Sequence, residues 1–272
     1  MSLVVVFCRR WINWSAEQKR ERWESASDFQ RDFRVVEMHE HWQRSNPRIS
    51  LYRYRERLQQ LACRSWEAIG ARLIMQVLPA DASHDVPLAP DLVMQLRQAN
   101  WLIPIDDDDW LAPGLAASLP GLDRFCYWMA TWPSQLVYVH PERFQCATPF
   151  SLLPETEEHA CPILVSSSYA LSCRLVQHLS DQELSLALMQ HGEASRWRML
   201  TPNGLQLKLQ ACNAIHLRHQ ATAGFTNLGA LDRRLNDFAG NPSGEPLVEW
   251  AHGMLKELND IHLAMKRESD HY

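Results

Sequence analysis

The sequence predicts an α/β fold in which a mixed, mostly parallel sheet is flanked by helices, with a helical appendage at the C-terminus. Two observations carry this prediction. Apolar runs of strand length alternate with helical patterns up to about residue 110, and parallel neighbouring strands need such crossover helices. A linker-like stretch, "AGNPSGEP" at 239–246, then separates the rest of the chain from one last helical pattern.

The first half of the chain alternates regularly between the two patterns. Strands are predicted at 3–8, 33–40, 71–78 and 101–105. Helices are predicted at 13–26, 50–70 and 89–100. The second of these helices ends in Gly70, a common helix stop, and the third has a proline in its first turn.

Past residue 120 the pattern changes. Two aromatic-rich strand candidates at 125–132 and 135–140 are joined by a short connection typical of an antiparallel hairpin. After them we expect the serine-rich turn "SSSY", a helix near 180–191, strands at 205–210 and 213–218, and a helix at 245–268. This order favours one domain over 1–240 followed by a C-terminal helix over 241–272.

Composition argues against several function classes. Lysine and arginine are spread along a chain of net charge −5, which gives no strong nucleic-acid signal. The seven cysteines are scattered without CxxC spacing, which predicts reduced thiols and no structural zinc. No apolar run approaches the ~18 residues that cross a bilayer, and the first run precedes its arginines, unlike a signal peptide. We therefore expect a soluble, cytoplasmic protein.

The most informative segment is "NWLIPIDDDDWLAP" at 100–113, where four aspartates follow an apolar strand. Ligands of open α/β sheets bind beyond the carboxyl ends of the strands, where this run falls. Adjacent carboxylates need a counter-charge, and Mg²⁺ or Mn²⁺ prefers oxygen ligands. In an extended strand end, alternate aspartates point to opposite sides, so one pair would face the ligand. The alternative is a solvated acidic turn in which one aspartate caps the next helix.

The stretch "LIPIDDDDWLAPGLAASL" resembles the DxD motif of glycosyltransferases of the GT-A fold, and within them is most similar to bacterial rhamnosyltransferase-like proteins. "VVVFCRRW" and "AIHLRHQATAGF" support the resemblance. It implies a GT-A-like (Rossmann-like) sheet, with a nucleotide-binding half at about 1–120 and an acceptor half at about 121–240. The implied activity is metal-dependent transfer of a sugar from a nucleotide-sugar donor to a carbohydrate or other hydroxyl acceptor, with surface polysaccharide synthesis as one setting.

The resemblance also implies roles for individual residues. The implied ligands of Mn²⁺ or Mg²⁺ are Asp106, Asp108, Asp109, His216 and His219. Asp106 and Asp107 are also candidates for contacts to the nucleotide. Of the two histidines His219 is favoured, because a small polar segment follows it, and His216 has almost equal support. For both histidines the alternative is an ordinary polar role on a half-exposed strand.

An inverting transferase also needs a general base that takes the proton of the acceptor hydroxyl. The loop "LLPETEEHA" offers Glu155, Glu157 and Glu158 for this role, with a solvated loop as the alternative. The other acidic cluster, "LSDQELS", instead looks like a helix cap. Arg9 and Arg10 follow the first strand and could bind the nucleotide, since guanidinium groups suit phosphate, or they form an ordinary surface pair.

Two other function classes stay open. A metal-dependent nucleotidyltransferase also places carboxylates at a strand end, although no glycine-rich phosphate loop follows the first strand here. The second class is a non-catalytic nucleotide- or sugar-binding protein of the same fold. Serine hydrolysis is disfavoured, because the chain has no GxSxG motif and "SSSY" lacks the flanking glycines of a nucleophile elbow.

Overall fold

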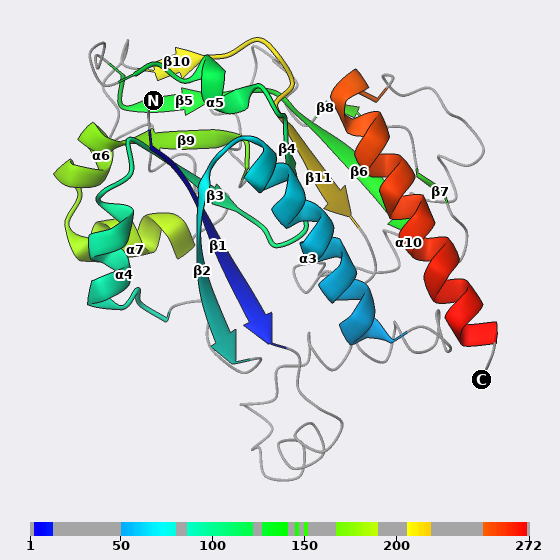
Figure 1. Cartoon of the computed structure of the whole chain (residues 1–272). Helices are drawn as coiled ribbons and strands as arrows, with labels where there is room; N and C mark the ends of the chain where they lie inside the picture. The colour runs from blue at the N-terminus through cyan, green and yellow to red at the C-terminus, as the bar shows by residue number, and fades with distance from the viewer. Residues whose placement is uncertain are drawn as a thin grey trace, which may run out of the picture.

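The computed structural model describes residues 3–12, 50–79, 86–121, 127–140, 145–146, 150–151, 167–189, 206–218 and 247–270. Within these ranges the predicted fold class is confirmed, because a mixed sheet with mostly parallel pairing lies between two groups of helices and the chain ends in a helix (Figure 1). The helix predicted at 13–26 and the strand predicted at 33–40 lie outside the described residues.

Six of the described strands form the main sheet, in the order β10-β5-β9-β3-β1-β2. β1 pairs in parallel with β2 and β3, and β5 pairs in parallel with β10, whereas β9 is antiparallel to β3 and β5. The strands are β1 (Val4–Ile12), β2 (Arg72–Pro79), β3 (Trp101–Ile105), β5 (Met129–Thr131), β9 (Tyr169–Ser172) and β10 (Gln206–Lys208). The alternation of patterns in the first half thus predicted the three parallel strands β1, β2 and β3.

β1 is buried on both of its faces. Val4, Val6 and Cys8 belong to one hydrophobic core, and Val5 and Phe7 belong to another. A strand in a parallel sheet that helices cover on both sides must be apolar at every position. This explains why "VVVFC" is an unbroken apolar run.

The first core is covered by α3 (Leu51–Ala68). The helix begins after Ser50, whose hydroxyl accepts a hydrogen bond from the amide of Arg53. It ends before Gly70, which has a φ of +67°. A left-handed residue just past the last turn is the usual helix stop, and glycine adopts it without steric cost.

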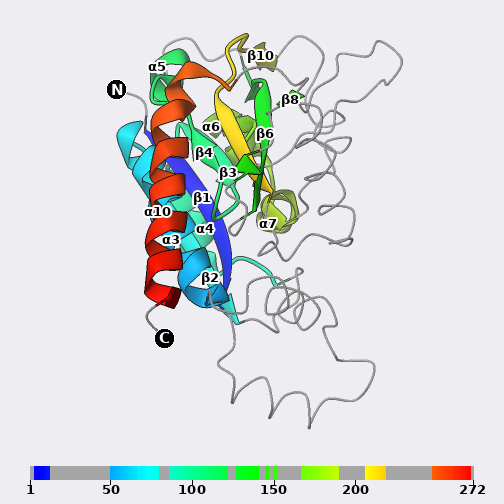
Figure 2. The ribbon, with the colours of Figure 1, turned by 90° about the vertical axis from the view of Figure 1, so that its right-hand side faces the viewer.

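The C-terminal helix, α10 (His252–Asp270), lies beside α3 in both views (Figure 1, Figure 2). Leu258 and Met265 of α10 are buried in the same core that α3 covers. The predicted C-terminal helix is therefore present, and it contributes directly to the main core. The division of the chain at about residue 240 into a domain and a helix stays a prediction.

Shorter helices complete the described part of the chain. Buried residues of α4, α6 and α7 belong to the second core, on the other face of β1. The short helices are α4 (Pro90–Leu96), α5 (Leu115–Ser118), α6 (Cys173–His178), α7 (Asp181–Met189) and the 3-10 turn η2 (Glu249–Ala251). Among the described helices, none combines the length and the apolar character that crossing a membrane requires.

A second sheet corrects one prediction. Its described strands follow the order β4-β11-β6-β7, with β8 also paired to β6, and are β4 (Trp110–Leu111), β6 (Ser134–His140), β7 (Gln145–Cys146), β8 (Phe150–Ser151) and β11 (Ala214–Arg218). The predicted hairpin at 125–140 is wrong, because β5 pairs within the main sheet and β6 pairs in parallel with β11. An aromatic, β-branched composition indicates a strand but does not specify its partner.

Candidate functional site

The four aspartates form a turn that connects the two sheets. β3 of the main sheet ends at Ile105, and β4 of the second sheet begins at Trp110. Between them the amide of Asp109 donates a hydrogen bond of 3.3 Å to the carbonyl of Asp106. The run is therefore not an extended strand end, because the chain must change direction here to enter the other sheet.

This turn follows the carboxyl end of β3, beside the last residues of its parallel neighbour β1. In the register of the sheet, Cys8 of β1 is opposite Ile105 of β3 and also opposite Met75 of β2. Arg9 and Arg10 therefore follow at the same edge as the aspartates. The acidic run therefore follows the end of a buried parallel strand, as expected, and the binding of a ligand there stays a prediction.

Asp107 is bound by two arginines from different elements. Its Oδ2 lies 3.3 Å from Nη2 of Arg55 in α3 and 3.7 Å from Nε of Arg10 in β1. Burial raises the pKa of the Asp107 carboxyl, the positive charge of Arg55 lowers it, and the nearby carboxylate of Asp108 raises it again. The side chain keeps 16% of its surface exposed, so this ion-pair cluster borders on solvent.

Arg9 has a different environment from its neighbour. Its Nε donates a hydrogen bond of 2.8 Å to Oε1 of Gln76 in β2, and its Nη2 donates to the carbonyl of Val86. The residue is 5% exposed. The structure thus places Arg10 against the acidic turn and Arg9 against the strand on the other side of β1.

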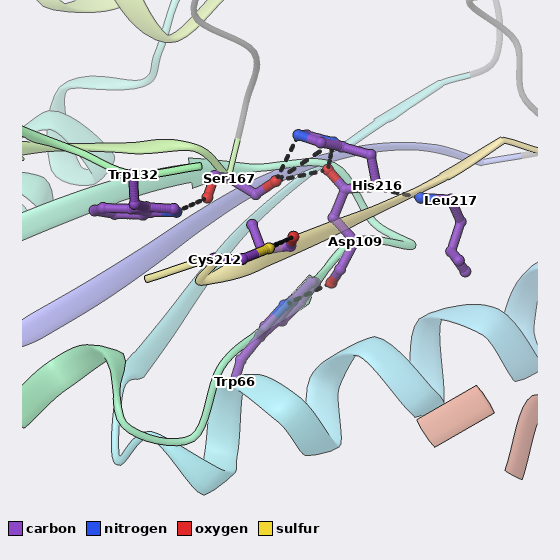
Figure 3. A network of polar contacts seen from close by, with 8 residues as sticks. Trp66, Asp109, Trp132, Ser167, Cys212, His216 and Leu217 are labelled. Carbon is purple, nitrogen blue, oxygen red and sulfur yellow. Dashed lines mark hydrogen bonds and ion pairs between the residues drawn. The ribbon is translucent and has the colours of Figure 1, made fainter. Parts of the chain in front are cut away.

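Asp109 is fully buried, and both of its carboxylate oxygens have partners from distant parts of the chain (Figure 3). Oδ2 lies 2.6 Å from Nδ1 of His216 and accepts a hydrogen bond of 2.9 Å from Oγ of Ser167. Oδ1 accepts a hydrogen bond of 3.4 Å from the amide of Leu217. The backbone carbonyl of Asp109 accepts another of 3.0 Å from Nε1 of Trp66.

Burial dominates the electrostatics of this network. It raises the pKa of Asp109 to about 6, against the opposing effect of the positive charge and hydrogen bond of His216. The His216 side chain is 1% exposed. Of the two candidate histidine ligands, His216 therefore faces Asp109 within the protein, and His219 lies outside the described residues.

Ser167 was not predicted as a site residue. It has a φ of 62°, which is uncommon for a residue other than glycine. Its amide donates to the carbonyl of Pro104 at 2.6 Å, and its carbonyl accepts from Nε1 of Trp132 at 2.7 Å. The sequence pattern predicted a turn at "SSSY" and disfavoured a catalytic nucleophile there. Ser167 is fully buried, so it does not suit the role of a nucleophile.

Asp106 and Asp108 are the remaining carboxylates of the turn. Asp106 is half-buried, and Asp108 is 9% exposed. Burial raises the pKa of Tyr169 in β9, and the negative charge of Asp106 raises it further. Within the described ranges, no three side chains of histidine, cysteine, aspartate or glutamate form a group that could hold a metal ion.

Two carboxylates nevertheless fit one kind of metal site. Mg²⁺ in nucleotide-dependent enzymes takes one or two carboxylates and completes its coordination with phosphate oxygens and water. Asp106 and Asp108 match that donor set, since they are oxygen ligands in one short turn. The chemistry of these residues thus fits a divalent ion that binds together with a diphosphate and does not fit a site built from protein ligands alone.

The remaining predictions concern the candidate general bases and a helix cap. Glu155, Glu157 and Glu158, the candidate bases, lie outside the described residues. The helix cap predicted in "LSDQELS" is confirmed, because Oε2 of Glu183 accepts hydrogen bonds from the amide and the hydroxyl of Ser180, and the amide of Glu183 donates to that hydroxyl.

Comparison with known proteins adds little to this geometry. No protein-family model matches the sequence, and no curated protein matches it. One similar solved structure is that of a Bacillus anthracis protein, provisionally assigned as a glucose-1-phosphate thymidylyltransferase, in complex with sucrose. It is 10% identical, with a TM-score of 0.33, over 86% of this chain and 96% of that chain. A similarity this low supports no conclusion about activity.

Proposed function

We propose that this protein is a metal-dependent glycosyltransferase, which transfers a sugar from a nucleotide-sugar donor to a hydroxyl acceptor. The observation that carries the proposal is the acidic turn at 106–109, which follows the carboxyl end of β3 and lies beside its parallel neighbour β1. Its resemblance to the DxD motif supplies the reaction class. The turn also follows the end of a strand in the main sheet, and ligands of open α/β sheets bind beyond the carboxyl ends of the strands. This position supports the assignment.

The residues of the turn have separate roles in this proposal. Asp106 and Asp108 would hold a divalent ion, and Asp106 would also contact the ribose. When bound, such an ion stabilises the negative charge that the diphosphate leaving group develops. Arg10, which lies beside the turn, would add a positive charge near the phosphates, since it is 20% exposed at the side chain. The acceptor base is proposed among Glu155, Glu157 and Glu158.

The test is ligand-induced stabilisation followed by a turnover assay. The purified protein is heated with Mn²⁺ and each of a panel of nucleotide sugars carrying uridine, guanosine, thymidine or cytidine. A ligand at about 100 times its Kd should raise the free energy of unfolding by ~2.7 kcal/mol, which a thermal scan detects easily. The double variant Asp106→Asn with Asp108→Asn should lose this stabilisation.

A matched control is Asp260→Asn, which removes an exposed carboxylate on α10. It should respond to ligand as the wild type does. The proposal fails if no nucleotide sugar with Mn²⁺ raises the unfolding temperature and the double variant behaves like the wild type. Release of pyrophosphate from a nucleoside triphosphate and a sugar 1-phosphate would instead identify a nucleotidyltransferase, and binding without turnover would indicate a binding protein.

A further inference from the structure

The network around Asp109 joins segments that are far apart in the sequence. Ser167, which precedes β9 in the main sheet, lies 58 positions away, and Leu217 of β11 in the second sheet lies 108 positions away. Trp66 of α3 is 43 positions away on the other side. In Figure 3 the side chains of Trp66, Ser167 and His216 and the backbone amide of Leu217 surround Asp109.

An ordinary surface turn does not need such a network. Burying a polar pair costs desolvation free energy, and well-packed apolar residues of similar size are often as stabilising. Ser167 adds the cost of a left-handed backbone conformation, which is unfavourable for a residue with a side chain. Residues that persist despite such costs often fix the geometry of a functional segment.

The geometry of the turn indicates which segment is fixed. The amide of Asp109 donates to the carbonyl of Asp106, so the backbone of one end restrains that of the other. Asp107, between them, is restrained by Arg55 and Arg10. Asp106 and Asp108 belong to the same four-residue turn, so the restraints on Asp107 and Asp109 limit the backbone that carries their carboxylates.

We propose that Asp109, His216 and Ser167 are positioning residues, which hold the turn so that Asp106 and Asp108 face a divalent ion bound with a diphosphate. This inference rests on the proposed function. It gives His216 a different role from the metal ligand that the resemblance implies. Nδ1 of His216 lies 2.6 Å from Oδ2 of Asp109, so the histidine acts on the ion only through the turn.

A pair of variants at position 216 separates positioning from simple burial. His216→Asn keeps a hydrogen-bond donor close to the place of Nδ1, whereas His216→Leu fills similar space without a donor. The dissociation constant for Mn²⁺ is measured from the electron paramagnetic resonance signal of the free ion, with and without UDP or dTDP. Hydrogen exchange of the amides at 106–112 reports on the turn without any ligand.

At a temperature where circular dichroism shows every variant folded, His216→Leu should bind Mn²⁺ with UDP or dTDP at least tenfold more weakly than the wild type. Its amides at 106–112 should exchange faster, and His216→Asn should restore both properties to within about threefold of the wild type. The control is Leu188→Ala, which creates a cavity in the core on the other face of the sheet. It should lose stability and keep its affinity for Mn²⁺.

The outcomes distinguish this inference from the proposed function. If the wild type binds Mn²⁺ with either nucleotide and folded His216→Leu binds equally well, the positioning role is wrong and the proposed function stands. If the wild type binds Mn²⁺ with none of the diphosphates of uridine, guanosine, thymidine and cytidine, both are wrong. Should His216→Leu fail to fold, Ser167→Ala replaces it. This variant removes the hydroxyl that contacts Asp109 and His216 and leaves the contact between Asp109 and His216. Unchanged affinity in that variant would also overturn the inference.

Discussion

Asp107 and Asp109 are two residues apart, yet different groups neutralise their carboxylates. Arg55 and Arg10 bind Asp107 near the surface, and His216 with Ser167 binds Asp109 in the interior. Four chemically identical side chains in a row therefore acquire different properties from the elements that each one meets.

The raised pKa of Asp109 predicts how the stability of the protein depends on pH. The folded-state pKa of about 6 is above the ordinary value of 3.8, so the folded protein holds a proton that the unfolded chain has lost between these values. The contribution of Asp109 to stability is therefore greatest below about pH 4 and is lost as the pH rises through about 6. Asp109→Asn removes this titration.

Urea unfolding of the wild type and of Asp109→Asn, followed by fluorescence between pH 4 and 8, tests this prediction. The difference in unfolding free energy, wild type minus variant, should decrease from pH 4 to about pH 6 and change little above it. A difference that increases over the same range would mean that His216 lowers the pKa of Asp109 more strongly than burial raises it.

Sequence patterns predicted the place of these residues better than their contacts. The apolar strand before the aspartates and the alternation around it were enough to locate the turn at the edge of a sheet. The resemblance placed Asp109 and His216 in one site as metal ligands, but no sequence pattern indicated their direct contact or the contact with Ser167. These contacts depend on how the two sheets pack. The same limit explains the wrong hairpin, since β5 and β6 are separated only by Trp132 and Pro133 and yet enter different sheets.

At the scale of the elements, Arg97 connects α4 with α6 and α7 through hydrogen bonds. Arg97, which follows α4, donates hydrogen bonds of 2.7 Å to the carbonyls of Val176 and Leu179 at the end of α6. It also donates one of 2.7 Å to Oδ1 of Asp181 at the start of α7. A planar guanidinium with several donors can satisfy all three acceptors at once, which a lysine could not do with the same geometry.

Replacing this arginine should loosen the three helices. Arg97→Met keeps much of the apolar volume and removes the donors, so it should lower the free energy of unfolding by about 2 kcal/mol. Asp181→Asn is the matched control, because it removes the charge of an exposed partner and should cost less than about 1 kcal/mol. Equal losses in urea denaturation would show that the ion pair, and not the carbonyl contacts, is the important interaction.

For the whole molecule, the main consequence of the architecture is that the C-terminal helix is part of the core. The helical pattern at 245–268 predicted this helix, and the linker-like composition at 239–246 before it predicted an appendage. Neither pattern indicated what the helix covers. α10 packs beside α3, and the side chains of both helices share a core with β1, β3 and the second sheet.

A substitution on α10 tests this integration. Leu258→Ala removes a fully buried side chain and should lower the free energy of unfolding by about 3 kcal/mol in a single transition of the whole protein. Leu263→Ala, on the same helix, truncates a side chain that is 44% exposed and should change it by less than about 0.5 kcal/mol. A separate low-temperature transition in Leu258→Ala would contradict the shared core.

Asp109 is far in sequence from its partners, and this separation affects the order in which the protein folds during its synthesis. The amide that binds Oδ1 belongs to residue 217, and β6 finds its parallel neighbour only in β11. Contacts between such distant positions form late, because long loops must close first. During translation the acidic turn leaves the ribosome more than a hundred residues before its last partner. Asp107 can pair with Arg10 and Arg55 as soon as it is synthesised, because both arginines precede it in the chain. The buried partners of Asp109 follow much later, so its part of the turn matures among the final steps of folding.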